Sequence, residues 1–142
     1  MTQFQISCLN CGLPYPETGV PYCCPACGGL FDFTQLSNFN KSTFEPVLLG
    51  EGNTPLVWAE AFGRSVAFKC EYQNPTGSFK DRGSAALVSF LKSRGVTEAV
   101  EDSSGNAGAS FAAYAARAGI RARVFVPESA SGPKRRQIEA YG

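Results

Sequence analysis

The sequence contains no histidine among its 142 residues, which excludes every Ser/His or Cys/His mechanism built from this chain alone. Charge of neither sign dominates, because 13 basic and 12 acidic residues leave a net charge of +1, without the basic footprint of a nucleic-acid binder. No apolar run is long enough to span a bilayer, and the opening residues lack the apolar core of a secretory signal. We therefore expect a cytoplasmic protein with no nucleic-acid and no membrane partner.

The composition that is present allows a folded domain. Hydrophobic residues make up 44% of the chain, so a packed core is feasible, and no internal repeat or low-complexity tract appears. The character of the chain changes after a cluster of cysteines near the start. We expect a zinc-ribbon-like module at 1–35, a connector at 36–53, and an α/β region at 54–142.

Four cysteines have the spacing of a metal site. Cys8 and Cys11 form one Cys-x-x-Cys pair, and Cys24 and Cys27 form a second pair after twelve intervening residues. Two such pairs are typical of a four-thiolate zinc site, which would be structural because it leaves no open ligand position.

Alternatives to this ligand set remain open at this point. Two disulfides would also use four cysteines, although a chain without a signal peptide should keep its thiols reduced. Cys23 is adjacent to Cys24 and could replace it as a ligand. Cys70 stands alone in a strand-like run, where we expect a small buried apolar residue.

The remaining residues alternate between strand and helix patterns with short links. The expected strands are 54–59, 65–72, 95–102 and 121–127, and the expected helices are 80–93, 107–117 and 131–142. This order is typical of a doubly wound parallel α/β sheet, in which ligands bind at the carboxyl ends of the strands.

The loop "NPTGSFKDRG" at 74–83 places a lysine at the start of an expected helix. Its Asn, Pro and Gly residues favour a turn, and Ser78 is a candidate N-cap. Lys80 would then lie near unpaired amides and the positive end of the helix dipole, which disfavours its protonated form. A lysine that loses its proton readily suits a Schiff-base nucleophile, and the alternative is an ordinary exposed lysine.

A second loop, "EDSSGNAGAS" at 101–110, leads from an expected strand into the alanine-rich helix. Its small polar residues would present hydroxyls and backbone amides at a helix N-terminus, as in a carboxylate or phosphate site. The loop is neither a Walker loop nor a complete G-x-G-x-x-G, so nucleotide binding is poorly supported. A capped turn with small residues for packing is the alternative.

Three motifs in this order resemble the amino-terminal half of threonine synthase: "EGNTPL" (51–56), "NPTGSFKDRG" (74–83) and "SSGNAGASFAAYAARAGI" (103–120). More broadly, they resemble pyridoxal-phosphate enzymes of the tryptophan-synthase-β fold type, and the Cys-x-x-Cys segment resembles that of many threonine synthases. The resemblance implies that Lys80 forms a Schiff base with pyridoxal 5′-phosphate and moves protons at the substrate. It also implies that Asn106 and Phe79 contact the cofactor.

The resemblance further implies a substrate site and a reaction. Substrate contacts would come from Ser103, Ser104, Ala107 and Thr54. The reaction would be the conversion of O-phosphohomoserine and water to threonine and phosphate, with the cofactor's pyridinium as the electron sink. The substrate is then a small amino-acid phosphate, and a homodimer is expected for the full-length enzyme.

The chain departs from the family in its length. The glycine-rich loop for the cofactor phosphate, and the residues expected to contact the pyridine nitrogen and the substrate phosphate, are not found. We expect an amino-terminal fragment, inactive alone, with an unpaired sheet edge and an uncovered apolar helix face. Two alternatives are a threonine/serine dehydratase or β-replacement synthase of the same fold type, and a non-catalytic zinc-ribbon module.

Overall fold

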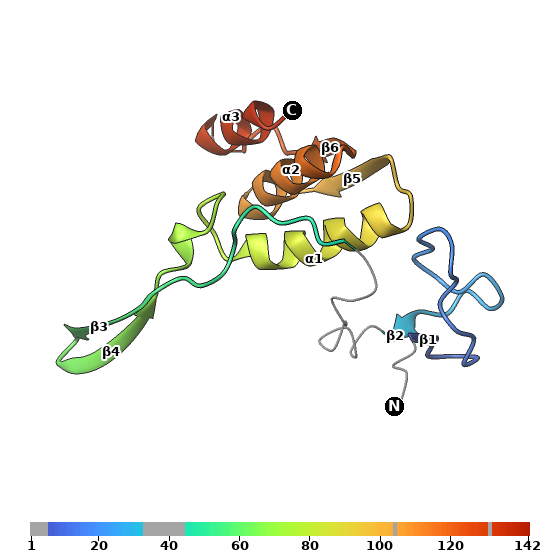
Figure 1. Cartoon of the computed structure of the whole chain (residues 1–142), viewed down its shortest axis with the longest axis horizontal. Coiled ribbons are helices and arrows are strands. Elements are labelled where there is room, and N and C mark those ends of the chain that lie inside the picture. The colour runs from blue at the N-terminus through green and yellow to red at the C-terminus, as the bar shows by residue number, and fades with distance from the viewer. Residues whose placement is uncertain (1–5, 33–44, 104, 131) are drawn as a thin grey trace.

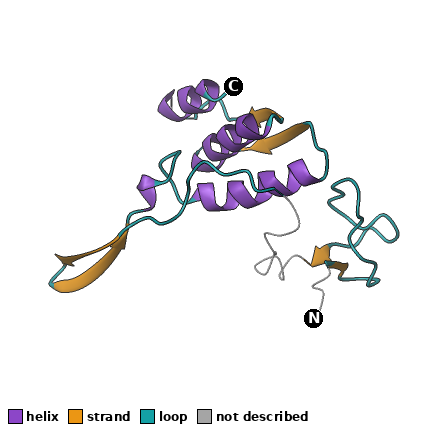
Figure 2. Cartoon of the chain, in the orientation of Figure 1, coloured by secondary structure: helices purple, strands orange, loops and turns teal. Residues whose placement is uncertain are grey.

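The computed structural model describes residues 6–32, 45–103, 105–130 and 132–142. The expected module boundary at residue 35 and the first half of the expected connector, 36–44, lie outside these ranges. The elements are β1 (Ser7–Cys8), β2 (Phe31–Asp32), β3 (Leu56–Ala61), β4 (Arg64–Lys69), a 3-10 turn (Glu71–Gln73), α1 (Lys80–Ser93), β5 (Glu98–Asp102), α2 (Asn106–Ala118), β6 (Arg121–Phe125) and α3 (Gly132–Ala140). Figure 2 shows three separate strand pairs, with the helices gathered in one part of the chain.

One strand pair confirms part of the fold prediction, a parallel α/β arrangement. β5 and β6 are parallel, in a register that runs from Glu98 opposite Arg121 to Asp102 opposite Phe125, and α2 connects them. Within the described residues, each of these two strands has only the other as a partner, which leaves the outer edges unpaired as expected. Apolar side chains also remain uncovered on this sheet, since Val100 is 61% and Phe125 60% exposed.

The strand expected at 65–72 does not belong to the parallel sheet, so that part of the prediction was wrong. β4 pairs instead with β3 as an antiparallel hairpin, from Leu56 opposite Lys69 to Ala61 opposite Arg64. Only residues 62 and 63 separate the strands, and a two-residue link can join only antiparallel neighbours. Phe62 and Gly63 both have positive φ (53° and 68°), as a type I′ hairpin turn requires. The hairpin projects away from the helices (Figure 1).

Helix α2 lies at the centre of the helical part. It packs against α1 on one side, α3 on another and β6 on a third (Figure 1). Every residue from Gly108 to Ala115 is therefore buried. This explains why the helix has small or apolar side chains on all of its faces. The core consists of Val47, Ala85, Val88, Phe111, Ala113, Tyr114, Ala115 and Ile120.

Glycine is required at one position of α2 by a close approach. A Cβ on residue 108 would lie 2.6 Å from the carbonyl oxygen of Ser103 and 2.9 Å from Cγ1 of Val124. Gly108 therefore lets the first turn of α2 pack directly on the preceding loop and on β6. No helix in the described ranges is long and apolar enough to cross a membrane.

Candidate functional site

A buried carboxylate holds the lysine-bearing loop in place. Asp81 is fully buried and accepts hydrogen bonds from the Thr76 amide (2.7 Å), from the Thr76 hydroxyl, and from the Ser110 hydroxyl on α2 (2.6 Å). The first bonds close the turn at 76–81, and the last attaches it to α2. The local sequence thus fixes the direction of the residue that precedes Asp81, which is Lys80.

Lys80 is the first residue of α1 and is exposed. Its Nζ lies 4.8 Å from the ring centroid of Phe79, a cation–π contact, and that ring is 56% exposed. The N-cap position falls at Phe79, whose side chain makes no capping hydrogen bond. Ser78 Oγ instead accepts a hydrogen bond from the Lys80 amide at 3.2 Å.

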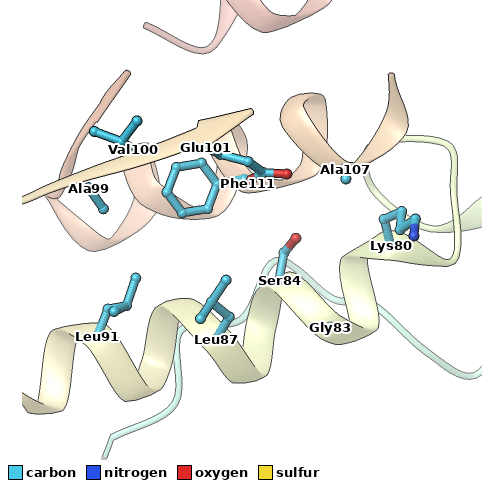
Figure 3. A pocket seen from close by; sticks show the side chains of 10 residues that line it. All are labelled: Lys80, Gly83, Ser84, Leu87, Leu91, Ala99, Val100, Glu101, Ala107 and Phe111. Atoms are coloured by element: carbon cyan, nitrogen blue, oxygen red, sulfur yellow. The ribbon is translucent and has the colours of Figure 1, made fainter. Parts of the chain in front are cut away.

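Lys80 lines a pocket of about 510 Å³ between α1, β5 and the start of α2 (Figure 3). Its polar side chains are those of Lys80, Ser84 and Glu101, and Ala107 closes the same end. The apolar end is formed by Leu87, Leu91, Ala99, Val100 and Phe111. Figure 3 shows the Ser84 hydroxyl and the Glu101 carboxylate at the end of the pocket where Lys80 lies.

The pocket contains two polar residues that the sequence interpretation missed. Ser84 lies one turn after Lys80 on α1, and Glu101 lies near the carboxyl end of β5. The spacing of Ser84 from Lys80 is a signal that could have found Ser84, because a residue four places along a helix shares a face with the first. Burial raises the pKa of the Glu101 carboxyl, and the neighbouring Lys80 charge opposes that shift.

The second predicted loop lies beside this pocket. Ser103 Oγ accepts hydrogen bonds from the amides of Gly108 (2.9 Å) and Gly105 (3.4 Å), so its side chain shapes the entry to α2. A hydroxyl that accepts still carries one O–H donor for a ligand. Asn106 is the exposed first residue of α2, and Ala107 lines the pocket. Ser104 lies outside the described residues.

Thr54 lies in a different polar cluster. It is buried, and its hydroxyl donates to Glu71 Oε1 at 2.8 Å and accepts from the guanidinium of Arg82 at 3.1 Å. Arg82 also forms a 2.9 Å ion pair with Glu71. The Tyr114 hydroxyl donates to Glu51 Oε2 at 2.6 Å. The "EGNTPL" segment is therefore attached to both α1 and α2, and Thr54 is not among the pocket-lining residues.

The four predicted cysteine ligands come together. The Sγ atoms of Cys8, Cys11, Cys24 and Cys27 all lie within 4.8 Å of one another. The Cys8–Cys27 and Cys11–Cys27 sulfur distances are both 3.5 Å, and the Cys11–Cys24 distance is 3.7 Å. A tetrahedral zinc ion with Zn–S bonds of about 2.3 Å needs sulfurs about 3.8 Å apart, so these residues fit the ion.

The backbone around the cluster affects the cysteine thiols in two ways. Hydrogen bonds from the backbone amides of Cys11 and Asn10 lower the pKa of Cys8 to about 7, although burial acts in the opposite direction. The backbone hydrogen bond at Leu13 acts to lower the pKa of Cys11, but hydrogen bonds with the neighbouring thiols and burial outweigh it, so this pKa is raised instead. A Cβ on Gly29 would lie 3.0 Å from Cys8 Sγ, so only glycine leaves room beside the cluster. Cys23 lies outside the cluster, and Cys70 is buried as expected.

The residues of the pocket also fit a pyridoxal-phosphate site in their chemistry. A lysine amine stands at one end of an open pocket, and Ala107 in the first turn of α2 also lines it. Residues 47–142 match the family of pyridoxal-phosphate-dependent enzymes. The chain belongs to this family.

Individual members of this family show which enzymes the chain is similar to. A threonine synthase of Mycobacterium leprae is 48% identical over 87 residues, covering 58% of this chain and 24% of that protein. A threonine synthase of Methanosarcina acetivorans is 31% identical over 87% of this chain and 37% of its own length. The crystal structure of O-ureido-L-serine synthase is 34% identical, with a TM-score of 0.62 over 70% of this chain and 34% of that one. The chain thus spans less than two-fifths of the length of these relatives.

Proposed function

We propose that this chain carries the lysine-bearing part of a threonine synthase-like lyase, which converts O-phosphohomoserine and water to threonine and phosphate. The observation that carries the proposal is the placement of Lys80 and the start of α2 around one pocket. That placement occurs in a chain with 48% identity to a threonine synthase over 87 residues. Because the chain covers only part of its relatives, the complete active site would need residues beyond those seen here.

Each residue in the proposed site has a defined task. Lys80 would hold the cofactor covalently and move protons at the substrate's Cα and Cβ, and its free position at the start of α1 gives the amine room to do so. Bound pyridoxal phosphate would supply an electron sink for charge that develops at the substrate. Phe79 would pack beside the cofactor ring, and the Asn106 amide group would donate to the cofactor's phenolic oxygen.

The entry to α2 would bind the substrate's carboxylate. Ser103 is oriented by the Gly108 amide and keeps its own O–H for donation. The amides around Ala107 lie at the positive end of the α2 dipole, which favours an anion. Ser104 would join them, and Thr54, which does not line the pocket, would support the site only through its bonds to Glu71 and Arg82. The four-cysteine cluster, distant from these groups in sequence, would bind zinc for a structural purpose.

Reductive trapping tests the central claim on this chain. Pyridoxal phosphate is added, bound cofactor is fixed with borohydride, and the labelled lysine is identified by peptide mass spectrometry. We expect labelling concentrated at Lys80 and abolished in Lys80→Ala. Lys92, in the last turn of the same helix, is the matched control. Equal labelling of Lys80 and Lys92 would contradict the proposed cofactor site.

A β-replacement synthase is the second candidate, favoured by the likeness to O-ureido-L-serine synthase. The two functions differ in the substrate's leaving group. If a form of the protein with the complete active site releases phosphate from O-phosphohomoserine, the lyase is supported. Release of a β-substituent from an O-substituted serine supports the synthase, and ammonia release from threonine or serine supports a dehydratase.

A further inference from the structure

The cysteine-containing segment at 6–32, here called the ribbon, is attached to the carboxyl end of α1 (Figure 1). Arg94 is the C-cap residue of α1. Its Nε donates a 3.1 Å hydrogen bond to the carbonyl of Gly19, and its terminal nitrogen donates to the carbonyl of Pro16. One side chain therefore binds two carbonyls of one ribbon loop, a fork geometry that suits a guanidinium.

Aromatic rings enclose the same guanidinium. Its carbon lies 5.6 Å from the ring centroid of Tyr15 and 5.5 Å from that of Phe90. The two rings are 6.2 Å apart, one from the ribbon and one from α1. Because both distances are within the range of a cation–π contact, Arg94 links the ribbon to α1 by charge as well as by hydrogen bonds.

The ribbon loop that receives Arg94 depends on the cysteine cluster. Tyr15 packs edge-on against Phe31, with ring centroids 4.7 Å apart, and its hydroxyl donates to the Pro21 carbonyl at 3.1 Å. Phe31 in turn is buried with Cys8 and Cys24 in the ribbon's own small core. A continuous series of contacts thus runs from the thiolates through two aromatic rings to Arg94.

The ribbon is too small to keep this shape by its own packing. Its two strands have two residues each, and its core contains three buried residues. Segments of this size usually need a metal or disulfides to fold, and the described cysteines are all free thiols. The loop that binds Arg94 should therefore form only when a metal holds the cluster.

We propose that the ribbon is a metal-dependent brace for α1, in which a thiophilic divalent ion such as zinc orders the loop at 15–21 and Arg94 transmits that order to the helix. Lys80 begins the same helix, so metal in the ribbon stabilises the element that positions it. The inference stands independently of the proposed reaction, because it concerns metal affinity and the order of α1. An independent ribbon, merely adjacent to α1, would show no such linkage.

Coupling between metal binding in the ribbon and the order of α1 is reciprocal, so it can be measured as an effect of metal on the helix and as an effect of Arg94 on metal affinity. The first measurement is amide hydrogen exchange in the wild-type chain with zinc bound and after its removal by a chelator. We expect zinc removal to increase exchange both in the ribbon and at residues 90–94. If exchange increases only in the ribbon, or if the chain binds no zinc, the proposal is overturned, and this result needs no variant.

The second measurement is zinc affinity, by competition with a chromophoric chelator. Arg94→Ala should weaken zinc binding about fivefold to tenfold, within the usual range of coupling between sites. Arg94→Lys should weaken it less, because it keeps the charge and loses the fork. Arg117→Ala, an exposed arginine in the last turn of α2, is the matched control and should leave affinity unchanged. Equal affinities in Arg94→Ala and Arg117→Ala would overturn the brace.

Discussion

The Ser110 hydroxyl donates a 2.6 Å hydrogen bond to the Asp81 carboxylate, and this bond joins α2 to the first turn of α1. Both residues are completely buried. A buried carboxylate is costly unless its hydrogen bonds are made, and Asp81 has three donors around it, two of them from Thr76. The neighbour of Lys80 is therefore the point at which loop, α1 and α2 are held together.

Asp81→Ala should be strongly destabilising. The change leaves the Ser110 and Thr76 hydroxyls and one amide without their buried acceptor, and hydrogen bonds to charged groups are worth about 1.5–3 kcal/mol each. We expect the free energy of unfolding to fall by about 3 kcal/mol or more, measured by urea denaturation.

Two variants calibrate that result. Ser110→Ala removes one donor and leaves the other two, so it should cost about 1–2 kcal/mol. Asp102→Ala removes an exposed carboxylate at the end of β5 and should change stability by no more than about 0.5 kcal/mol. The interpretation of Asp81 fails if its alanine variant is as stable as that of Asp102.

Glu71 should give the protein a specific acid sensitivity. Hydrogen bonds from Arg82, then from Thr54 and Asn74, lower the pKa of Glu71 from its ordinary 4.5 to about 2. Because the folded state has the lower pKa, ionised Glu71 stabilises the fold above about pH 4.5, and this contribution is lost as the pH falls toward 2. The stability difference between wild type and Glu71→Gln should be present near neutral pH and shrink across this interval.

Comparison of two proteins at each pH removes the contribution of other groups, including release of metal from the cysteines in acid. Glu60→Gln, an exposed glutamate on β3, is the control and should follow the wild type throughout. A wild-type advantage over Glu71→Gln that stays constant down to about pH 2.5 would rule out the assigned role.

Local signals in the sequence were sufficient for the helices and for the parallel pair. The bounds of α1, Lys80–Ser93, were confirmed residue for residue, because a loop rich in turn residues precedes a broad apolar face. The partner of β4 was not recognised, since alternation within a strand does not reveal the direction of its neighbour. The two-residue gap at Phe62 and Gly63 was the available signal, and its positive φ values identify the turn.

In the candidate site, too, some residues could be predicted from local motifs and others could not. Motif spacing was sufficient to bring Lys80 and Ala107 to one pocket. Ser84 was missed although its spacing from Lys80 was an available signal, and Glu101 was missed because its place in the pocket depends on how β5 lies relative to α1, which no single motif encodes. Spacing also could not separate Cys23 from Cys24, since adjacent residues differ only in the side to which the backbone turns them.

The choice of Cys24 as ligand can be tested with a matched pair. Cys24 is 1% exposed with its Sγ in the cluster, whereas Cys23 lies outside the cluster. Cys24→Ser should lose zinc and the thermal stabilisation that zinc provides, because three thiolates and a hydroxyl bind the ion more weakly. Cys23→Ser should retain about one zinc per chain by metal analysis. The reverse pattern would assign the site to Cys23.

Alanine should have opposite effects at two helical glycines. At Gly108 a new Cβ would lie 2.6 Å from the Ser103 carbonyl oxygen, a backbone atom that cannot move without disturbing the loop, whereas at Gly83 it would meet nothing within 4 Å. Gly83→Ala should therefore raise the free energy of unfolding by about 0.5–1 kcal/mol, the ordinary helix-propensity gain. Gly108→Ala gains the same propensity but should be net destabilising by about 1–3 kcal/mol through overpacking. Urea denaturation of both variants measures the signs, and a stabilised Gly108→Ala protein would mean that α2 does not approach Ser103 as closely as described. The pair thus tests the geometry of the α2 entry, where the substrate's carboxylate is proposed to bind, without requiring activity.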